Sequence, residues 1–483
     1  MQEVRIDAVP LQRLELLLPP ARVEMLEQTA VHARALLAGR TVWNLNSTAH
    51  GGGVAEMLQV LLSYGRGAGV DTRWLVIEGD PAFFAITKRV HNLLHGAPGD
   101  GGELGSAEIR HFLEVSEANA VVATAMIRPG DVVLLHDPQT AGLVAPLVEL
   151  GAHVAWRCHI GSGMVTRETE RGWGFLRPLI EPAHAFVFSR PSYVPEWLPP
   201  ERVRIIAPSI DPFSTKNVTL EPAEVGATLR RAGLVDLPED GGSLAFGRRD
   251  GTTGSVREHT GLLLGDRPIP AAARMVLQVC RWDRLKDMSG VLTGVAARLG
   301  ELPSDVHLLL AGPDVRGVVD DPEGAAVFET CANLRAELPA PARARLHLAL
   351  LPMDDPDENA HLVNALQRHA TVVLQKSLAE GFGLTVTEPM WKSKPVLASA
   401  VGGIPDQIED GVSGVLLHDP NDLGAMVRLL GQLLGDPGRG ASLGAAAHER
   451  VRDYFLGDRH LVQWVQLFDA VTASARPRRP ARA

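Results

Sequence analysis

Two glutamates and two glycines frame a short stretch that is suited to bind a sugar linked to a phosphate. Glu380 precedes Gly381 and Gly383, and Glu388 follows about one helical turn later. An apolar run, 370–374, leads into them, which predicts a buried strand, a glycine turn and a helix start. Backbone N–H groups at a helix start favour an anion, whereas carboxylates accept hydrogen bonds from hydroxyl groups. Together these features predict a sugar-nucleotide site.

Two cations follow another predicted strand, 274–280. Arg281 and Lys286 are suited to a diphosphate, because a guanidinium and an ammonium both neutralise charge on a departing phosphate. A solvated charged turn is the alternative. Glu380 and Glu388 also suggest the carboxylate pair of a glycoside hydrolase. Their positions around a glycine turn favour a role in holding ligand hydroxyl groups instead.

The first half of the chain has its own glycine loop and a histidine at a strand end. Gly51, Gly52 and Gly53 separate a predicted strand from a predicted helix. They either let a phosphate approach the backbone or simply form a tight turn. The loop matches neither the Walker A pattern nor GxGxxG. His159 follows the predicted strand 152–158, so it is either a ligand-facing or a buried structural histidine.

Other polar groups follow predicted strands or lie in acidic turns. His136, Asp137 and Gln139 close a predicted strand and are candidates for the acceptor side of the site. The acidic turns 320–323 and 354–358 suggest metal ligands, but solvated loops are the favoured interpretation. We predict no metal site.

Strands and helices alternate in two successive series, which predicts parallel sheets covered by helices on both faces. The first series has strands at 40–46, 72–77, 131–135, 152–158 and 185–188. The second has strands at 274–280, 306–311, 346–351, 370–374, 395–398 and 414–417. Ligands bind at the carboxyl ends of such strands and often between domains. We therefore expect an α/β fold with two doubly wound, Rossmann-like domains and an interdomain cleft.

The two series place the domain boundaries. The first domain is expected to span 1–205 and to be joined by a C-terminal helix at about 458–475. The second domain is expected to span 206–457. Within it, residues about 235–262 are rich in Gly, Asp, Arg and Thr, and we interpret them as an insertion or surface loop. The basic tail, 476–483, is expected to be disordered.

Composition limits the partners and the compartment. A chain of 483 residues favours two to three domains, and a formal net charge of −10 argues against nucleic acid as the main partner. Three scattered cysteines without a CxxC pair indicate neither a disulfide framework nor a zinc site. The N-terminus has no apolar signal core, and no apolar run reaches the ~18 residues of a membrane span. We expect a soluble cytoplasmic protein with no membrane partner.

In combination, these motifs resemble the retaining GT-B glycosyltransferases of family four, which include the glycogen synthase and sucrose synthase type. That family has a glycine loop, a cleft histidine, an Arg and Lys pair, and two glutamates separated by seven residues. The corresponding positions here are 51–53, His159, Arg281 with Lys286, and Glu380 with Glu388. The resemblance covers nearly the whole chain and implies the GT-B fold, with the acceptor in the first domain and the nucleotide sugar in the second.

Finer features resemble the trehalose-forming branch, which contains glycosyltransferring trehalose synthases and trehalose phosphorylases. They are the stretches 50–57, 83–92, 136–139, 363–368, 375–377, 391–392 and 402–405. The resemblance implies a glucosyltransferase that makes α,α-trehalose from a nucleoside-diphosphate (NDP) glucose and glucose. A phosphorylase that uses inorganic phosphate is the alternative. A sugar-nucleotide epimerase or a non-catalytic sugar-nucleotide-binding protein is more distant.

The resemblance also implies roles in donor binding. Arg281 and Lys286 would stabilise the leaving diphosphate, and His159 would contact the donor sugar near the reacting carbon. Glu380 would orient the hexose hydroxyl groups, and Glu388 would bind those of the ribose. Backbone amides would complete the nucleotide-sugar site, namely those of Gly51, Gly52, Gly53, Phe382, Gly383, Leu384 and Thr385.

Acceptor binding is implied for Lys88, His136, Asp137 and Gln139. The implied reaction retains the anomeric configuration, and the leaving phosphate deprotonates the incoming hydroxyl, so catalysis is mainly positioning and charge stabilisation. No cofactor is implied beyond the NDP-glucose substrate, and Mg²⁺ is compatible with that donor without being indicated. The sequence leaves open the nucleotide base (ADP, UDP or GDP), the acceptor and whether the protein forms a homodimer.

Overall fold

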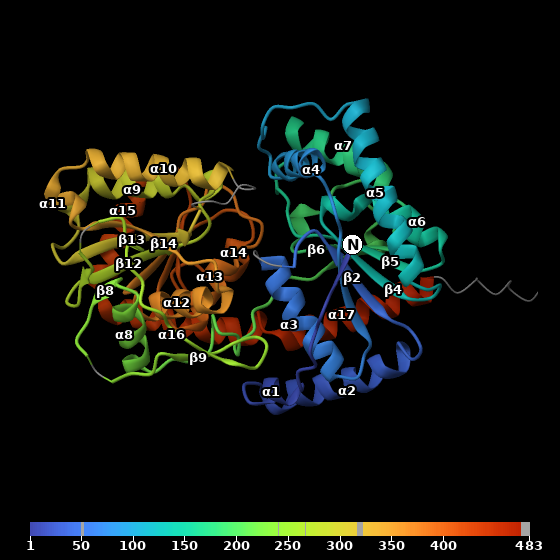
Figure 1. The fold of residues 1–483 in the computed structure, drawn as a ribbon, viewed down its shortest axis with the longest axis horizontal. Helices are drawn as coiled ribbons and strands as arrows, with labels where there is room; N and C mark the ends of the chain where they lie inside the picture. Colours follow the sequence, from blue (N-terminus) through green and yellow to red (C-terminus); the bar gives the residue numbers. More distant parts are fainter. Residues whose placement is uncertain (50–52, 240, 266, 316–321, 475–483) are drawn as a thin grey trace, which may run out of the picture. The chain divides into compact units, whose positions relative to one another are not determined.

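The structure is a computed structural model that describes residues 1–49, 53–239, 241–265, 267–315 and 322–474 (Figure 1). The chain divides into two compact units. Unit 1 is Met1–Ile210 with Phe455–Ala483, and unit 2 is Asp211–Tyr454. Each unit is built on its own, largely or wholly parallel sheet, so the predicted α/β fold with parallel sheets is confirmed.

The sheet of unit 1 has seven strands in the order β1-β3-β2-β4-β5-β6-β7. The strands are β1 (Gln2–Val4), β2 (Val42–Asn46), β3 (Thr72–Val76), β4 (Val132–His136), β5 (His153–Cys158), β6 (Ala185–Phe188) and β7 (Val203–Ile205). All neighbours are parallel except β1, which pairs antiparallel with β3. β1 was not predicted, because three residues are too few to show an alternating pattern and most of them are exposed.

Helices cover both faces of this sheet (Figure 1). One face carries α2 (Pro20–Leu36), α3 (Gly53–Gly67) and α17 (Gly457–Ser474), and the other carries α4 (Pro81–Leu94), α5 (Ser106–Met126), α6 (Val144–Glu149) and α7 (Arg167–Ile180). The shorter segments are α1 (Gln12–Glu15) and the 3-10 turns η1 (Pro138–Leu143), η2 (Pro191–Tyr193) and η3 (Pro200–Arg202). Every residue of β2, β4 and β5 is buried, as expected for central strands covered on both faces.

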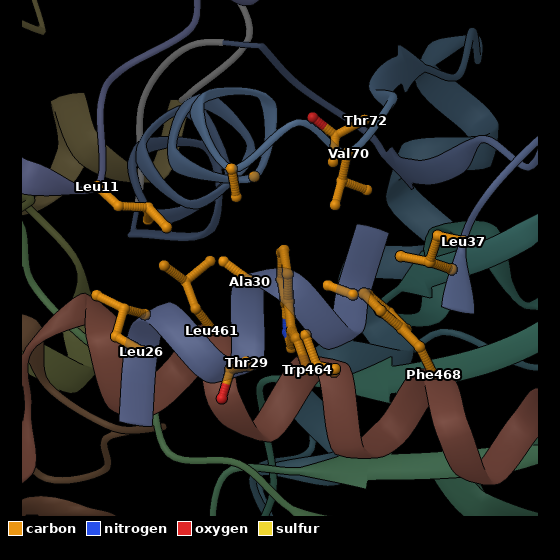
Figure 2. A pocket seen from close by; sticks show the side chains of 14 residues that line it. Leu11, Leu26, Thr29, Ala30, Leu37, Val70, Thr72, Leu461, Trp464 and Phe468 are labelled. Atoms are coloured by element: carbon orange, nitrogen blue, oxygen red, sulfur yellow. The ribbon is translucent and has the colours of Figure 1, made fainter. Parts of the chain in front are cut away.

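A small apolar pocket lies among α2, α3 and α17 in unit 1 (Figure 2). Leu461 and Trp464 of α17 face Leu26 and Ala30 of α2 across it. Its volume is about 40 Å³, and its lining is almost wholly apolar. Such a pocket offers few polar partners for a sugar, so the candidate site is found at the strand ends instead.

The sheet of unit 2 has six parallel strands in the order β14-β13-β12-β15-β16-β17. The strands are β12 (Arg274–Val279), β13 (Val306–Pro313), β14 (Leu346–Leu351), β15 (Val372–Gln375), β16 (Val396–Ser399) and β17 (Val415–Leu417). The chain winds outward from β12 in one direction and from β15 in the other. Ligands of doubly wound sheets bind at such a reversal, beyond the carboxyl ends of the strands.

Helices also cover both faces of the second sheet (Figure 1). One face carries α9 (Met288–Ala297), α10 (Pro322–Glu337), α11 (Ala340–Arg343) and α15 (Leu423–Gly435). The other carries α8 (Pro222–Arg231), α12 (Pro356–His369), α13 (Leu384–Trp391) and α16 (Pro437–Tyr454). The connections between strands also contain the short segments η4 (Arg284–Lys286), η5 (Leu299–Glu301) and α14 (Ile404–Gln407).

The segment expected to be an insertion or surface loop contains short strands. β9 (Ala245–Gly247) and β10 (Thr253–Ser255) form an antiparallel pair, and β8 (Val235–Asp236) pairs with β11 (Ile269–Pro270). Arginines near β9 and β10 form ion pairs with the acidic turn 354–358, which we had interpreted as a solvated loop; Asp354 is 64% exposed, whereas Glu358 is buried. The pairs are Arg248–Asp355, Arg249–Asp357, Arg257–Asp354 and Arg257–Glu358.

Four further sequence expectations concern an acidic turn, the C-terminal tail, the C-terminal helix and membrane spans. The acidic turn 320–323 lies partly outside the described residues, and the tail 476–483 lies wholly outside them. The C-terminal helix, α17, packs within unit 1. None of the helices in the described parts of the chain is long and apolar enough to span a bilayer.

Candidate active site

Lys286 and Glu380 meet at the carboxyl edge of the unit 2 sheet, beside the reversal between β12 and β15. Lys286 ends η4, which follows β12, and Glu380 lies in the loop between β15 and α13. The Lys286 ammonium donates a hydrogen bond to Oε2 of Glu380. Their side chains are only 13% and 11% exposed. The structure therefore joins a cation and a carboxylate that the sequence analysis had selected separately.

Arg281 is placed differently from Lys286. Its Nη2 lies 3.7 Å from Oδ2 of Asp283, and its side chain is 58% exposed. Both arginine and lysine follow β12, but only the lysine reaches Glu380 in this structure. Arg281 is thus a solvent-exposed cation, paired locally with Asp283, rather than part of the buried pair.

The glycine turn before α13 has a conformation that requires glycine. Gly383 has φ of 90° and caps the helix. A Cβ atom on Gly383 would lie 3.1 Å from Cγ of Glu380, so the turn and the carboxylate are packed together. Gln407 donates a hydrogen bond from Nε2 to the carbonyl of Phe382, which fixes the position of the turn. The turn is therefore a rigid support for Glu380.

The first turn of α13 supplies hydrogen-bond donors. Leu384 and Thr385 are its first two residues, and amides at these positions have no acceptor within their own helix. The Thr385 hydroxyl is buried without a hydrogen-bond partner among the described residues. Glu388, one turn later, is 5% exposed, and Oε1 lies 3.5 Å from Nζ of Lys216. An anion at this helix start would satisfy the donors that the protein leaves open.

Sequence reasoning missed the residue that ties the two loops together. Gln278, which is fully buried in β12, donates from Nε2 to the Lys286 carbonyl at 2.8 Å. Its Oε1 accepts from the backbone N–H of Lys376 at 3.0 Å. Leu378 adds a backbone bond to Leu285 at 2.7 Å. The only available signal was a polar side chain among the apolar residues that follow Arg274 in β12.

A buried ion pair reinforces this connection. The Lys376 ammonium, 1% exposed, pairs with the Asp287 carboxylate. Asp287 has φ of 44° and also caps α9, since Oδ1 accepts from the N–H of Gly290. Burial lowers the pKa of Lys376 to about 8, and the negative charge of Asp419 opposes this shift. Both loops of the candidate site are therefore anchored from behind.

In unit 1, His136 and His159 form a stacked pair. His136 ends β4 and His159 follows β5, with Nδ1 of the first 3.0 Å from Nε2 of the second. On its other side, Nε2 of His136 lies 2.9 Å from Oδ1 of Asn44 in β2. Burial lowers the pKa of both imidazoles well below the usual range, and the charge of Arg157 adds to this shift. Both rings are therefore neutral at neutral pH.

Asp137 combines backbone strain with a perturbed carboxyl group. Its φ of 64° and ψ of 176° lie in a region that L residues seldom adopt. Oδ1 accepts from the backbone N–H of His159 at 2.8 Å. Burial raises the pKa of Asp137 to about 7, against the opposing effects of that N–H and of Arg157. Strain of this kind concentrates at functional sites.

The remaining predicted site residues are scattered or undescribed. Gln139 lies in η1 and is half-buried, and Lys88 lies on α4 and is exposed. Gly53 begins α3, whereas Gly51 and Gly52 fall outside the described residues. Over the described ranges, no three His, Cys, Asp or Glu side chains are grouped as metal ligands would be.

Comparison with known proteins gives two matching family models. One, described as "Trehalose synthase, N-terminal domain", matches residues 44–195. The other, described as "Glycosyl transferases group 1", matches residues 346–450. Each match falls within one of the two units and contains predicted site residues of that unit.

Similar proteins of known name include trehalose synthases. The chain is 35% identical to that of Pyrococcus horikoshii over 435 residues, which cover 90% of this chain and 91% of the relative. It is 36% identical to that of Thermococcus litoralis over 445 residues, covering 91% and 93%. A trehalose phosphorylase of Pleurotus sajor-caju is 27% identical over 405 residues, and the match spans 77% of this chain but only 50% of that protein.

Solved structures share the fold at low sequence identity. An α,α-trehalose-phosphate synthase (UDP-forming) from Burkholderia vietnamiensis aligns with a TM-score of 0.66 at 13% identity, covering 91% of this chain and 98% of that one. A sucrose-phosphate synthase from Thermosynechococcus elongatus aligns with a TM-score of 0.61 at 17% identity, covering 90% and 100%. These alignments confirm the GT-B fold.

Proposed function

The chain belongs to the trehalose synthase family of GT-B glycosyltransferases, and from that premise we propose that it makes α,α-trehalose from an NDP-glucose and free glucose. A trehalose-related hexosyl transfer follows from the family. We propose three further details: NDP-glucose is the donor, glucose is the acceptor, and the anomeric configuration is retained.

The pairing of Lys286 with Glu380 beside the start of α13 is the observation that carries this proposal. A sugar nucleotide carries anionic phosphate oxygens next to a sugar with several hydroxyl groups. An ammonium and open helix amides bind the first, and a carboxylate binds the second. We assign Lys286 to the diphosphate and Glu380 to the hexose hydroxyl groups. Arg281, whose side chain is exposed, would exchange its contact with Asp283 for one with the diphosphate.

The other assignments follow the same chemistry. Glu388 is assigned to the ribose hydroxyl groups, and Leu384 and Thr385 to the phosphate oxygens. His159 is assigned to the donor hexose. On the acceptor side we assign the polar groups at the end of β4 and in the turn after it, namely His136, Asp137 and Gln139. We assign a lesser role to the exposed Lys88 on α4.

In the proposed reaction, an acceptor hydroxyl oxygen bonds to the anomeric carbon while the bond from that carbon to the phosphate oxygen breaks. The acceptor proton passes to the departing phosphate on the same face, which retains the configuration. Lys286 and the α13 amides then stabilise the charge that develops on the diphosphate. Each contact of this kind typically contributes roughly 3–4 kcal/mol to transition-state stabilisation.

A phosphorylase reaction is the second candidate, because trehalose phosphorylases also match this chain. The synthase reaction is favoured by relatives that are more similar and that align over nearly their whole length. Inorganic phosphate in place of the diphosphate would use the same cation and helix start.

The test is a product analysis with purified protein in two directions. Glucose is supplied with ADP-, UDP- or GDP-glucose, and trehalose is supplied with either phosphate or a nucleoside diphosphate. We expect trehalose in the first direction and an NDP-glucose in the second. Glucose 1-phosphate from trehalose and phosphate, without any NDP-glucose, would replace the synthase proposal by the phosphorylase.

A further inference from the structure

Within unit 1, a chain of three side chains runs from the buried Asn44 through His136 to His159, a predicted site residue. Asn44 lies in β2, fully buried, and its Oδ1 is 2.9 Å from Nε2 of His136. Nδ1 of His136 is 3.0 Å from Nε2 of His159. The first link crosses the reversal between β2 and β4, where doubly wound sheets bind ligands. Asn44 is thus the innermost member of a relay that ends at a predicted site residue.

With Oδ1 of Asn44 facing His136, as it does in this structure, the relay has one consistent direction of hydrogen bonding. A carbonyl oxygen only accepts, so Nε2 of His136 carries the proton that Asn44 receives. A neutral imidazole has a single N–H, so Nδ1 of His136 is an acceptor. Nε2 of His159 must then be the donor to it. This leaves Nδ1 of His159 with a lone pair and no proton.

This assignment of protons requires both imidazole rings to be neutral. Burial lowers the pKa of His136 and of His159 well below the usual range, and the buried Arg157 guanidinium lowers both further. His460, whose own pKa is lowered by burial, shifts the pKa of His159 in the same direction. Asp137 is the carboxyl group beside the pair, and it contacts the backbone N–H of His159 rather than a ring nitrogen. Neither imidazole is therefore expected to hold a second proton near neutral pH.

The amide of Asn44 is energetically unfavourable at this position in one respect. Its Nδ2 is buried without a hydrogen-bond partner in the described part of the chain. An unpaired buried donor is unfavourable, and leucine would fill a similar volume without it. What leucine lacks is the acceptor oxygen that faces His136. The contact of this carbonyl with His136 is thus the interaction that a leucine at this position would remove.

We propose that Asn44 is a positioning residue that sets the tautomer of His159 through His136, so that Nδ1 of His159 meets the ligand as an acceptor. Such an acceptor suits a sugar hydroxyl, which can donate. The contact between His159 and a sugar hydroxyl rests on the function proposed above, whereas the tautomer of His159 does not. The tautomer and its effect on catalysis can therefore be measured separately.

The test compares Asn44→Leu and Asn44→Asp with the wild type by ¹⁵N NMR of histidine-labelled protein. Ring nitrogens with and without a proton have well-separated shifts, and His136→Gln and His159→Gln variants assign the signals. Asn119→Leu is the matched control, because Asn119 is also buried in unit 1 but bonds to the backbone of Glu78. Spectra are recorded at pH 8, where an aspartate only accepts.

We expect wild type, Asn44→Asp and Asn119→Leu to show His159 protonated on Nε2 alone. Asn44→Leu should lose that single tautomer, and its kcat/KM should fall about tenfold, the effect of one hydrogen bond. A wild-type His159 protonated on Nδ1 would overturn the proposal, as would an unchanged His159 spectrum in Asn44→Leu. A changed tautomer with unchanged kinetics would support the relay but count against the sugar-binding role of His159.

Discussion

The ammonium of Lys286 lies against the carboxylate of Glu380, although 94 positions separate them in the chain. Both side chains are largely buried, so each charge is neutralised by its neighbour before any ligand arrives. A ligand that separated them without replacing both interactions would leave a buried charge unpaired, which is costly. A molecule with phosphate oxygens and hydroxyl groups replaces both. The pair therefore selects for a ligand that combines these two groups.

Replacing Lys286 tests its assignment to the diphosphate. Lys286→Ala should lower kcat by about 100-fold or more, because a charge contact to the leaving group is lost. Arg284→Ala is the matched control, since Arg284 is in the same 3-10 turn but its side chain is 79% exposed. Steady-state kinetics and thermal unfolding of both variants separate catalysis from folding. An unchanged kcat in a folded Lys286→Ala protein would remove Lys286 from the mechanism.

Gln278 gives a prediction about positioning. Gln278→Met keeps the volume but leaves the carbonyl of Lys286 and the N–H of Lys376 without their buried partner. Each unsatisfied group costs about 1–3 kcal/mol. We expect lower stability in urea unfolding and a loss of kcat beyond that of an equally destabilised variant of α16. Normal kcat at a temperature where the variant is fully folded would show that the loops hold their positions without Gln278.

The fold could be predicted from the sequence because its signals are local. Apolar, β-branched strands such as β15 and the glycine turn at Gly383 are readable over a few residues. Parallel sheets then place the following loops at one edge, which is why Lys286 and Glu380 were both selected. Their direct contact could not be predicted, because it depends on how two loops pack together.

Features that depend on distant partners were not accessible in the same way. The acidic turn 354–358 looked solvated because its arginine partners lie about a hundred residues earlier in the chain. The relay from Asn44 to His159 was hidden for the same reason, since its members lie on three different strands or strand ends. A single sequence shows residue types but not which of them become neighbours.

Gly383 allows backbone strain to be separated from a specific contact. Gly383→Ala introduces a Cβ at a φ of 90° and 3.1 Å from Cγ of Glu380. Gly411→Ala introduces one at a φ of 76° with no atom within 4 Å. Both should lose roughly 1–2 kcal/mol of stability from the left-handed backbone. Only the first should raise KM for the donor, because only it displaces Glu380; equal donor KM values would contradict this role of the turn.

The raised pKa of Asp137 predicts that the stability of the folded protein decreases as the pH rises. Burial raises its pKa from an ordinary value of 3.8 to about 7, so between these pH values the folded protein holds a proton that the unfolded chain has released. The stability from this group is therefore complete below about pH 4 and is lost as the pH rises through about 7. Asp137→Asn keeps an oxygen for the His159 N–H and still tolerates a positive φ, but it does not titrate. Urea unfolding should then show the variant gaining on the wild type between pH 5 and pH 8. A stability difference that stays constant over this range would mean that the carboxyl titrates alike in the folded and unfolded states, and that burial does not govern its charge.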